Sequence, residues 1–532
     1  MLSPLWLTLL LQALPSAIAV PAVSTHSESP PDAYITAIIT SIPVHANLPD
    51  GECYDIRYCR TLEGLVLSCL VTIFACVWFA VHRNIPAPKV HRPRHGNVFV
   101  RTGLFVWYKI LDQRQAVIVF VVTLLVPEWV LAWALRQWIV AHKLTGRLED
   151  ARAEANEKRK ELLSKGMETE KEVGEPSVHA AIDELPAEPS GISVKPEHAL
   201  LANPESKLLN RVASRRCKKR CEDCDVHKSE YDQVAMAKRV GKANEAWRLA
   251  HALFIIMGGY NFCGEDGPIH PVSPENAVEL VKRGHLVAPT SDELANQSKG
   301  DALSKGVAIL QTLWFVMQCI ARRIEHLSVT NLEVMTLAYT VITVAMYIVW
   351  WDKPLNVSCA VRVPEEEVEE EIVLKYDSLW AQIIIYVMGL QDRYLDLRQC
   401  TRVPTFWAAD RDDYAFIADI IALLVAMIFG AVHCIAWSYP FQSHLEQQLW
   451  RASAIAIIAV PAALALGVLV AKLLDESCGL GFDTILAILY VPLASMYIAA
   501  RIILILISFT SLRMLPAGAY RTVQWITFVP HI

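Results

Sequence analysis

Apolar residues are concentrated in seven blocks along the chain, each bounded by charged side chains. The blocks are residues 62–81, 115–135, 306–321, 332–351, 414–437, 452–471 and 484–511. An α-helix needs roughly 17–25 apolar residues to cross the hydrocarbon core of a bilayer. The pattern therefore predicts seven membrane-spanning helices, of which 306–321 is the shortest.

The composition agrees with this pattern. Of the 532 residues, 54% are hydrophobic and 20% are charged, whereas soluble domains have about 45–50% apolar and about 25% charged residues. The 49 Lys and Arg against 55 Asp and Glu leave a net charge of −6, which gives no general attraction to nucleic acid. We expect an all-α, multi-pass transmembrane bundle whose partner is the lipid bilayer, with no cofactor.

The N-terminus has the features of an export signal. Residues 5–20 are apolar and end in Ala17-Ile18-Ala19, a small-x-small pattern that signal peptidase can cut. We predict a signal peptide at residues 1–19. Because no Lys or Arg precedes the apolar stretch, an uncleaved anchor is the alternative, and either reading exports residues 20–61.

Loop charges predict the orientation of the spans. The loop 82–114 carries seven Lys and Arg residues against the single acid Asp112, so it should face the cytoplasm. Seven spans then place the N-terminus and the loops 136–305 and 352–413 outside, and the tail 512–532 in the cytoplasm, in the plasma membrane or secretory pathway. Both glycosylation sequons, at Asn296 and Asn356, fall outside in this arrangement.

The long loop 136–305 divides into three parts. Residues 136–172 are rich in Ala, Glu, Lys and Arg and predict a solvated helix that extends the second span. Residues 173–206 have too few large apolar side chains to fold, and residues 257–305 predict an ordered cap. The polybasic run 211–220 would suit a cytoplasmic lipid surface, but long loops are exported largely regardless of charge.

One cluster in this loop could bind a metal. Cys217, Cys221, Cys224 and His227 offer three thiolates and an imidazole, which suit zinc. The same C-x3-C-x2-C spacing resembles the iron–sulfur motif of radical S-adenosylmethionine enzymes, although no alternating strands and helices accompany it. The simpler alternative is a set of exposed cysteines. In the exported segment, Cys53 and Cys59 are candidate disulfide partners.

Several sequence blocks carry a family resemblance. They are residues 127–137 (PEWVLAWALRQ), 257–262 (MGGYNF), 298–305 (SKGDALSK), 311–315 (QTLWF), 350–357 (WWDKPLNV), 444–451 (HLEQQLWR) and 525–532 (WITFVPHI). Together they resemble a large family of fungal multi-pass membrane proteins. The resemblance implies an integral membrane protein and supplies no catalytic residues.

Ionisable side chains within the apolar blocks are candidates for function, because a charge in the bilayer is costly. Glu128 follows Pro127, which opens the helix. Tyr490, Tyr497 and Arg501 share one helix face, and Arg501 is the expected partner of Glu128. Asp419 and His433 lie on one side of the fifth block. The alternatives are a structural ion pair for Glu128 and helix packing for the other stripes.

These observations favour a transporter or channel-like protein with a buried polar site. A seven-span receptor or structural membrane protein is the alternative. We expect no enzyme, because the sequence offers no metal-binding H-x-x-x-H array, Gly-rich phosphate loop or ordered catalytic triad.

Overall fold

The structure is a computed structural model that describes most of the chain from Cys59 onward. The described residues are 59–87, 113–172, 245–264, 267–298, 302–364, 379, 382, 385–386, 389–410, 415–478 and 482–525. All of them belong to one compact unit, Cys53–Ile532. The predicted signal peptide, the linker 173–206 and the polybasic run lie outside the described residues.

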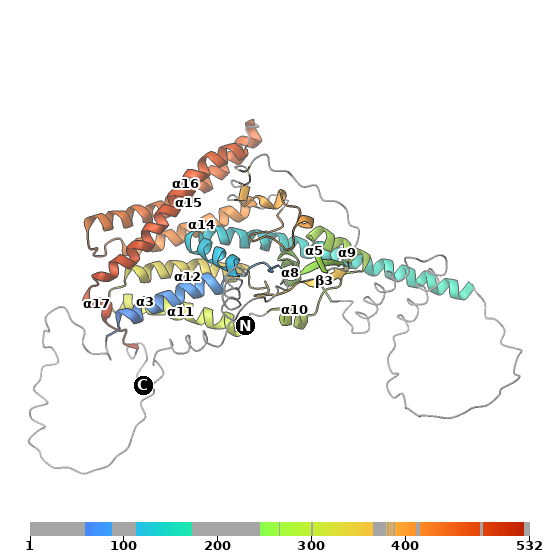
Figure 1. The fold of residues 1–532 in the computed structure, drawn as a ribbon, viewed down its shortest axis with the longest axis horizontal. Helices are drawn as coiled ribbons and strands as arrows, with labels where there is room; N and C mark the ends of the chain where they lie inside the picture. Colours follow the sequence, from blue (N-terminus) through green and yellow to red (C-terminus); the bar gives the residue numbers. More distant parts are fainter. Residues whose placement is uncertain are drawn as a thin grey trace, which may run out of the picture. The chain divides into compact units, whose positions relative to one another are not determined.

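Long helices dominate the fold, as the apolar blocks predicted (Figure 1). They are α3 (Leu62–Phe74, continued by the π-helical turn η1, Ala75–Phe79), the helix Gln113–Leu125, α5 (Pro127–Glu172), α11 (Ala302–Ile324), α12 (Asn331–Val349), α14 (Ala415–His433, continued by η5, Cys434–Ala436), α15 (His444–Cys478) and α16 (Phe482–Thr510). Among the described residues, six helices are long and apolar enough to cross a membrane, or seven if one bent pair counts as a span.

The bent pair is the predicted second span. The helix Gln113–Leu125 ends at Val126, and α5 starts at Pro127 after a bend of 111°. Proline has no backbone N–H and its ring clashes with the preceding turn, so the helix cannot continue through this position unchanged. We call the helix Gln113–Leu125 and the first turns of α5 the hairpin.

The helical bundle has one apolar core. Leu65, Tyr339, Phe429, Trp450 and Leu504 from five different helices are all buried in it. Outward faces remain apolar as well: on α11, Leu310, Leu313, Met317, Ile320 and Ile324 are each 49–68% exposed. An apolar stripe of this length on the surface is typical of a face that contacts another apolar phase.

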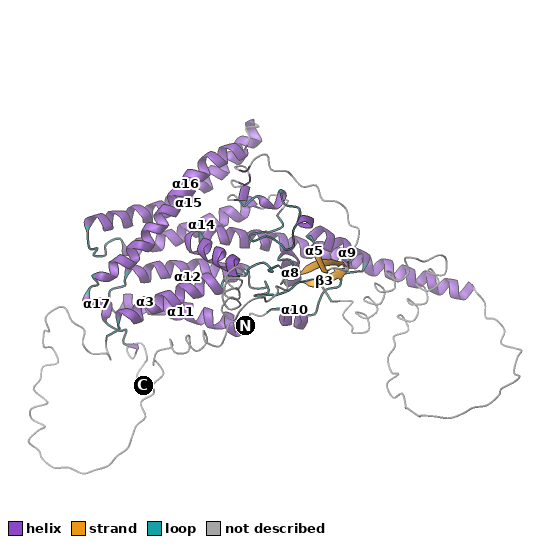
Figure 2. Ribbon diagram, viewed as in Figure 1, coloured by secondary structure: helices purple, strands orange, loops and turns teal. Residues whose placement is uncertain are grey.

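A second apolar core belongs to the cap. It joins the middle of α5 to α8 (Leu249–Ile256), α9 (Pro274–Arg283) and α10 (Ser291–Gln297). A three-stranded sheet, not predicted from the sequence, lies beside these helices (Figure 2). Its order is β2 (Gly267–Pro271), β1 (Tyr260–Gly264), β3 (Val361–Pro364), antiparallel between β1 and β2 and parallel between β1 and β3.

The remaining elements are single turns that connect or follow the long helices. They are η3 (Gln391–Arg393), η4 (Leu397–Gln399), η6 (Ser511–Arg513) and α17 (Ala517–Tyr520). The segment 389–410, which contains η3 and η4, supplies Val403 and Trp407 to the core of the cap. The charged stretch that follows the second apolar block continues α5 without interruption to Glu172.

Contacts between distant segments define the two ends of the bundle. At one end, Cys59 forms a β-bridge with Arg521, and Arg60 N–H donates to the Tyr520 carbonyl at 2.6 Å. At the other end, Ile85 N–H donates to the Met257 carbonyl of the cap at 2.9 Å. We refer to these as the terminal end and the cap end.

Candidate functional site at the helix break

The helix break leaves backbone carbonyls without their usual helical partners. The carbonyl of Leu124 accepts hydrogen bonds from Tyr339 Oη at 2.6 Å and from Arg501 Nη2 at 3.0 Å. The Leu125 carbonyl accepts from Arg501 Nε at 3.4 Å. A buried carbonyl without a partner costs about 1–3 kcal/mol, so α12 and α16 stabilise the bend by satisfying it.

Arg501 is fully buried at this point. Its Nη2 also donates to Tyr339 Oη at 2.7 Å, and the guanidinium lies 4.3 Å from the ring centre of Phe429. Stacking on an aromatic face offsets part of the cost of desolvating a cation. Arg501 Nη1 has no hydrogen-bond partner among the described residues, so the site retains one unused donor.

Glu128, one residue after the proline, is 8% exposed. Tyr497 donates its hydroxyl hydrogen to Glu128 Oε2 at 2.9 Å. Arg501 interacts with Glu128 electrostatically, but its hydrogen bonds go to backbone carbonyls and Tyr339. The predicted neighbours are thus brought together, with Tyr497 rather than Arg501 as the direct partner of the carboxylate. The hairpin site comprises Glu128, Tyr497, Arg501, Tyr339 and the Leu124 carbonyl.

A second ionisable group lies two turns further along α5. Arg136 Nη2 pairs with Asp419 Oδ1 at 2.6 Å, and its Nη1 donates to the Gly389 carbonyl. Tyr490, on the same face of α16 as Tyr497, lies close enough to both Glu128 and Asp419 for their charges to disfavour its ionisation. The predicted residues Glu128, Tyr490 and Asp419 therefore belong to one polar series between the hairpin site and the cap end.

His433 lies apart from Asp419, although both are on α14. Their separation of fourteen residues corresponds to about 21 Å along a helix. His433 Nδ1 is 3.0 Å from the Phe429 carbonyl, and the His433 carbonyl accepts from Trp450 Nε1 at 3.1 Å. The His433 ring packs on Phe429, which also lies under Arg501. His433 thus lies beside the Phe429 ring on which Arg501 stacks, and not with the Arg136–Asp419 pair.

Lys353 is a buried cation that the sequence reasoning did not select. It is 1% exposed, and its Nζ donates to Gln137 Oε1 at 2.7 Å and to the His82 carbonyl. The ammonium also lies 4.8 Å from the Trp133 ring centre and 4.5 Å from that of Trp350. Burial lowers the pKa of Lys353 well below its ordinary value. The only sequence signal was its place in the block WWDKPLNV.

Two further buried groups lie near these residues at the cap end. Burial and the positive charges of Lys305 and Lys353 lower the pKa of His82 well below its ordinary value. Burial raises the pKa of Asp392 to about 7, although the backbone N–H groups of Asp410 and Ala408 donate to its carboxylate. Neither residue carries a signal in the sequence, because each lies outside the apolar blocks.

Glu333, in the first turn of α12, is an ion-pair residue at the terminal end. It accepts both Arg60 terminal nitrogens, at 2.5 and 3.1 Å, and caps the N-terminus of α12 through the Thr330 N–H at 2.8 Å. Thr336 and Thr343, further along α12, donate to carbonyls of their own helix. The hydroxyls of these two threonines are therefore satisfied within α12.

Other predicted sites lie partly beyond the described residues. Cys217, Cys221, Cys224, His227 and Cys53 fall outside them. Cys59 is disulfide-bonded, and Cys359 and Cys400 are free thiols. Asn296 and Asn356 are both exposed. Within the described residues, no group of three or more His, Cys, Asp or Glu side chains could hold a metal ion.

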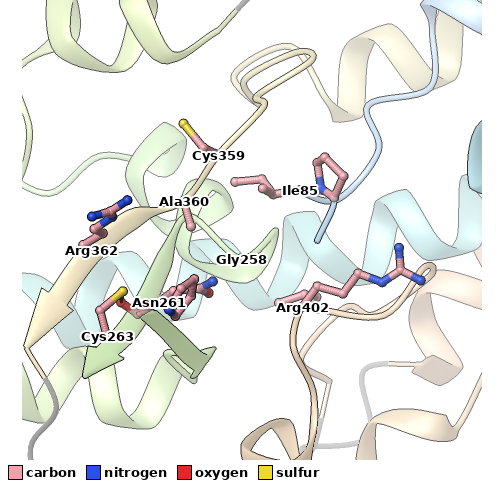
Figure 3. Close-up of a pocket in the computed structure, with 11 residues that line it drawn as sticks. Ile85, Gly258, Asn261, Cys263, Cys359, Ala360, Arg362 and Arg402 are labelled. Carbon is pink, nitrogen blue, oxygen red and sulfur yellow. Dashed lines mark hydrogen bonds between the residues drawn. The ribbon is translucent and has the colours of Figure 1, made fainter. Parts of the chain in front are cut away.

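The cap also contains a small pocket, lined by residues that include Cys263, Cys359, Arg362 and Arg402. Its volume is about 100 Å³, below the roughly 300–1,000 Å³ of typical small-molecule sites. Arg362 and Arg402 extend in opposite directions from it (Figure 3). The pocket is therefore a poor candidate for ligand binding, and the hairpin site is the better one.

Comparison with known proteins gives one match. Residues 207–385 are similar to a family of unknown function (DUF8562). No curated protein matches the chain. No solved structure matches it either.

Proposed function

We propose that this chain is an integral membrane transport protein in which Glu128 binds and releases a proton during transport. The observation that carries the proposal is the buried Glu128–Tyr497 hydrogen bond immediately after a helix break. Membrane transporters place substrate and coupling-ion sites at discontinuous helices, where exposed backbone groups and buried ionisable side chains meet.

The surroundings of Glu128 suit a group that changes charge. Arg501 stabilises the carboxylate through space, while its own hydrogen bonds to Leu124 and Tyr339 do not depend on the state of Glu128. Protonation of Glu128 would therefore leave the hairpin intact. Tyr490 and the Arg136–Asp419 pair continue the polar series toward the cap end, where the carboxyl could exchange protons.

Proton flux tests the proposal directly. The full-length protein would be reconstituted in phosphatidylcholine–phosphatidylglycerol liposomes that contain a pH-sensitive dye, and a valinomycin-induced potassium potential would drive protons. We expect wild-type protein to carry protons faster than protein-free liposomes, and Glu128→Gln to lower the protein-dependent rate at least tenfold. Equal rates for wild type and Glu128→Gln, or no wild-type flux above the protein-free rate, would contradict the proposal.

Glu63→Gln is the matched control. Glu63 is exposed in the first turn of α3, so the substitution removes one carboxylate of the same kind from a helix of the bundle without touching the hairpin site. Its flux should equal that of wild type. Size-exclusion profiles of the three proteins should coincide.

A further inference from the structure

We infer that the hairpin is a re-entrant loop, so that the chain crosses the bilayer six times and both terminal segments of the bundle lie on the outer face. This topology concerns how the hairpin contacts lipid. It does not depend on what the protein transports. It replaces the seven-span arrangement, in which residues 115–135 cross the membrane and the two ends lie on opposite faces.

Both arms of the hairpin begin and end at the cap end. Gln115, near the start of the first arm, donates to Thr405 Oγ1 at 3.2 Å. Gln137, on the second arm, donates to the Trp407 carbonyl at 2.7 Å. Asn84, which follows α3, donates to the Pro404 carbonyl at 3.0 Å. The segment 404–407 therefore holds the end of α3 and both arms of the hairpin.

The arms are too short to cross the membrane. Gln115 and Leu124 are nine residues apart, about 14 Å along a helix, and Pro127 and Gln137 are ten apart, about 15 Å. The hydrocarbon core is about 30 Å thick. The tip touches Tyr339 and Arg501, which lie near the middle of the spans Asn331–Val349 and Tyr490–Arg513. The hairpin thus reaches about half-way into the bundle and returns.

The tip of the hairpin can lie at this depth because its backbone carbonyls have hydrogen-bond partners. Irregular backbone at membrane depth is tolerated where protein covers it, and Arg501 and Tyr339 bind the Leu124 and Leu125 carbonyls. The outward side of the first arm is apolar, with Val117, Ile118 and Val121 each 44–52% exposed. The arm can therefore contact lipid on one side and protein on the other.

Aromatic residues beside arginines mark both membrane interfaces. At the cap end, the Arg83 guanidinium lies 5.2 Å from the Trp78 ring centre. At the terminal end, Arg451 lies 5.1 Å from Trp437. Trp and Arg pairs of this kind sit at the headgroup level of membrane proteins. They place the six helices across the bilayer with the cap on one side.

Cysteine chemistry assigns the faces. Cys59 at the terminal end is disulfide-bonded. Disulfides persist on the oxidising side of a membrane and thiols in the reducing cytosol. The terminal end is therefore outside and the cap is cytoplasmic. This places the basic loop 82–114 in the cytoplasm, as its charge requires, and gives the polybasic run 211–220 the same side.

Epitope tags distinguish the two arrangements. Four otherwise unchanged chains would carry one tag each, after Asp50, Gly96, Pro189 or Ile532, and would be stained in cells before and after permeabilisation. We expect the tags after Asp50 and Ile532 to stain on intact cells, and those after Gly96 and Pro189 only after permeabilisation. If the tags after Asp50 and Pro189 instead share one face and those after Gly96 and Ile532 the other, the hairpin crosses the membrane and the inference is wrong.

A second measurement does not rely on insertions. In the six-span arrangement Asn296 lies in the cytoplasm, so treatment of the native chain with an N-glycosidase should leave the mass of a peptide containing Asn296 unchanged. A glycan on Asn296 would overturn the assignment of faces. These results are independent of proton flux, so a failed transport assay would leave the topology standing, and the reverse also holds.

Discussion

Lys353 Nζ donates to Gln137 Oε1 at 2.7 Å and thereby joins the end of α12 to the second arm of the hairpin. The same ammonium donates to the carbonyl of His82, which follows α3. Three segments distant in sequence therefore meet on one buried amine. No carboxylate takes part in these hydrogen bonds, so neutral oxygens and two indole rings supply all of the stabilisation described for it.

Lys353→Met tests this junction. Methionine keeps most of the aliphatic stem but removes the Lys353 donor to the His82 carbonyl and one of the two donors to Gln137 Oε1, the other being Trp350 Nε1 at 3.2 Å, so we expect the free energy of unfolding to fall by about 1–3 kcal/mol. Denaturant unfolding followed by tryptophan fluorescence measures the change. Lys305→Met is the control, because the Lys305 amine bonds to the Trp351 carbonyl near the surface, and its effect should stay within about 0.5 kcal/mol.

Tyr497→Phe and Tyr490→Phe compare the direct hydrogen-bond partner of Glu128 with the second tyrosine on the same face of α16. Tyr497→Phe removes the hydrogen bond at 2.9 Å to the carboxylate, so stability should fall by about 0.5–1.5 kcal/mol and proton flux should fall with it. Tyr490→Phe removes a hydroxyl for which the structure shows no hydrogen bond among the described residues and should leave stability nearly unchanged. Equal effects of the two substitutions would show that Tyr497 has no special relation to Glu128.

Glu333→Ala breaks the buried pair with Arg60, whose side chain is 18% exposed against 4% for Glu333. Breaking a buried pair by removing one partner costs about 3–5 kcal/mol, and we expect a loss in this range. A double-mutant cycle with Arg60→Met measures the coupling between the two side chains. Glu63→Ala, at an exposed position on α3, should have little effect.

Asp392 predicts a pH dependence of stability. Its pKa is raised in the folded protein to about 7 from an ordinary value of 3.8. The folded state therefore favours the protonated carboxyl, and this contribution is complete below about pH 4 and lost as pH rises to about 7. Between pH 5 and 7, Asp392→Asn should reduce the decline in unfolding free energy by about 1–3 kcal/mol. Parallel pH profiles for the two proteins would contradict this assignment.

Gly389 and Gly284 form a matched pair, because both have a positive φ, 73° and 80°. A Cβ at Gly389 would overlap the Arg136 guanidinium, 2.9 Å from its central carbon, whereas at Gly284 the nearest atom is Arg159 Nη2 at 3.6 Å. Gly284→Ala should cost about 1–2 kcal/mol from backbone strain alone. Gly389→Ala should cost about 3 kcal/mol or more, because it also displaces Arg136 from Asp419. A similar cost at both positions would rule out the contribution from Arg136.

Much of the helical fold is predictable because long apolar runs depend on local composition. Six of the seven blocks form uninterrupted candidate spans, including 306–321, which extends to Lys305–Ile324. The direction of the chain after Pro127 could not be predicted, because a proline can kink a crossing helix or reverse it. Contacts from Tyr339 and Arg501, more than 200 residues away, determine the outcome.

Some of the buried polar residues could be predicted from the sequence, and others could not. Glu128, Tyr497 and Arg501 are conspicuous because each interrupts an apolar run. Lys353 and Arg136 lie just beyond the ends of apolar blocks, where a charge is expected at the membrane surface, and Asp392 lies outside the blocks altogether. Arg136 is buried and donates to the Gly389 carbonyl in the segment 389–410, which also contains Asp392, so the burial of Arg136 depends on a distant part of the sequence.

The helix α5 runs without a break from the hairpin into the cap. Its 46 residues span about 69 Å at 1.5 Å per residue, and only its first turns lie at the helix break. Because α9 packs on the middle of α5, a movement of the cap would tilt this helix, which carries Glu128 in its first turn. A tilt of a few degrees about the hairpin would displace the far end of α5 by several ångströms and the Glu128 carboxylate by a small fraction of that, so large movements of the cap would become small movements at the proposed proton-binding residue.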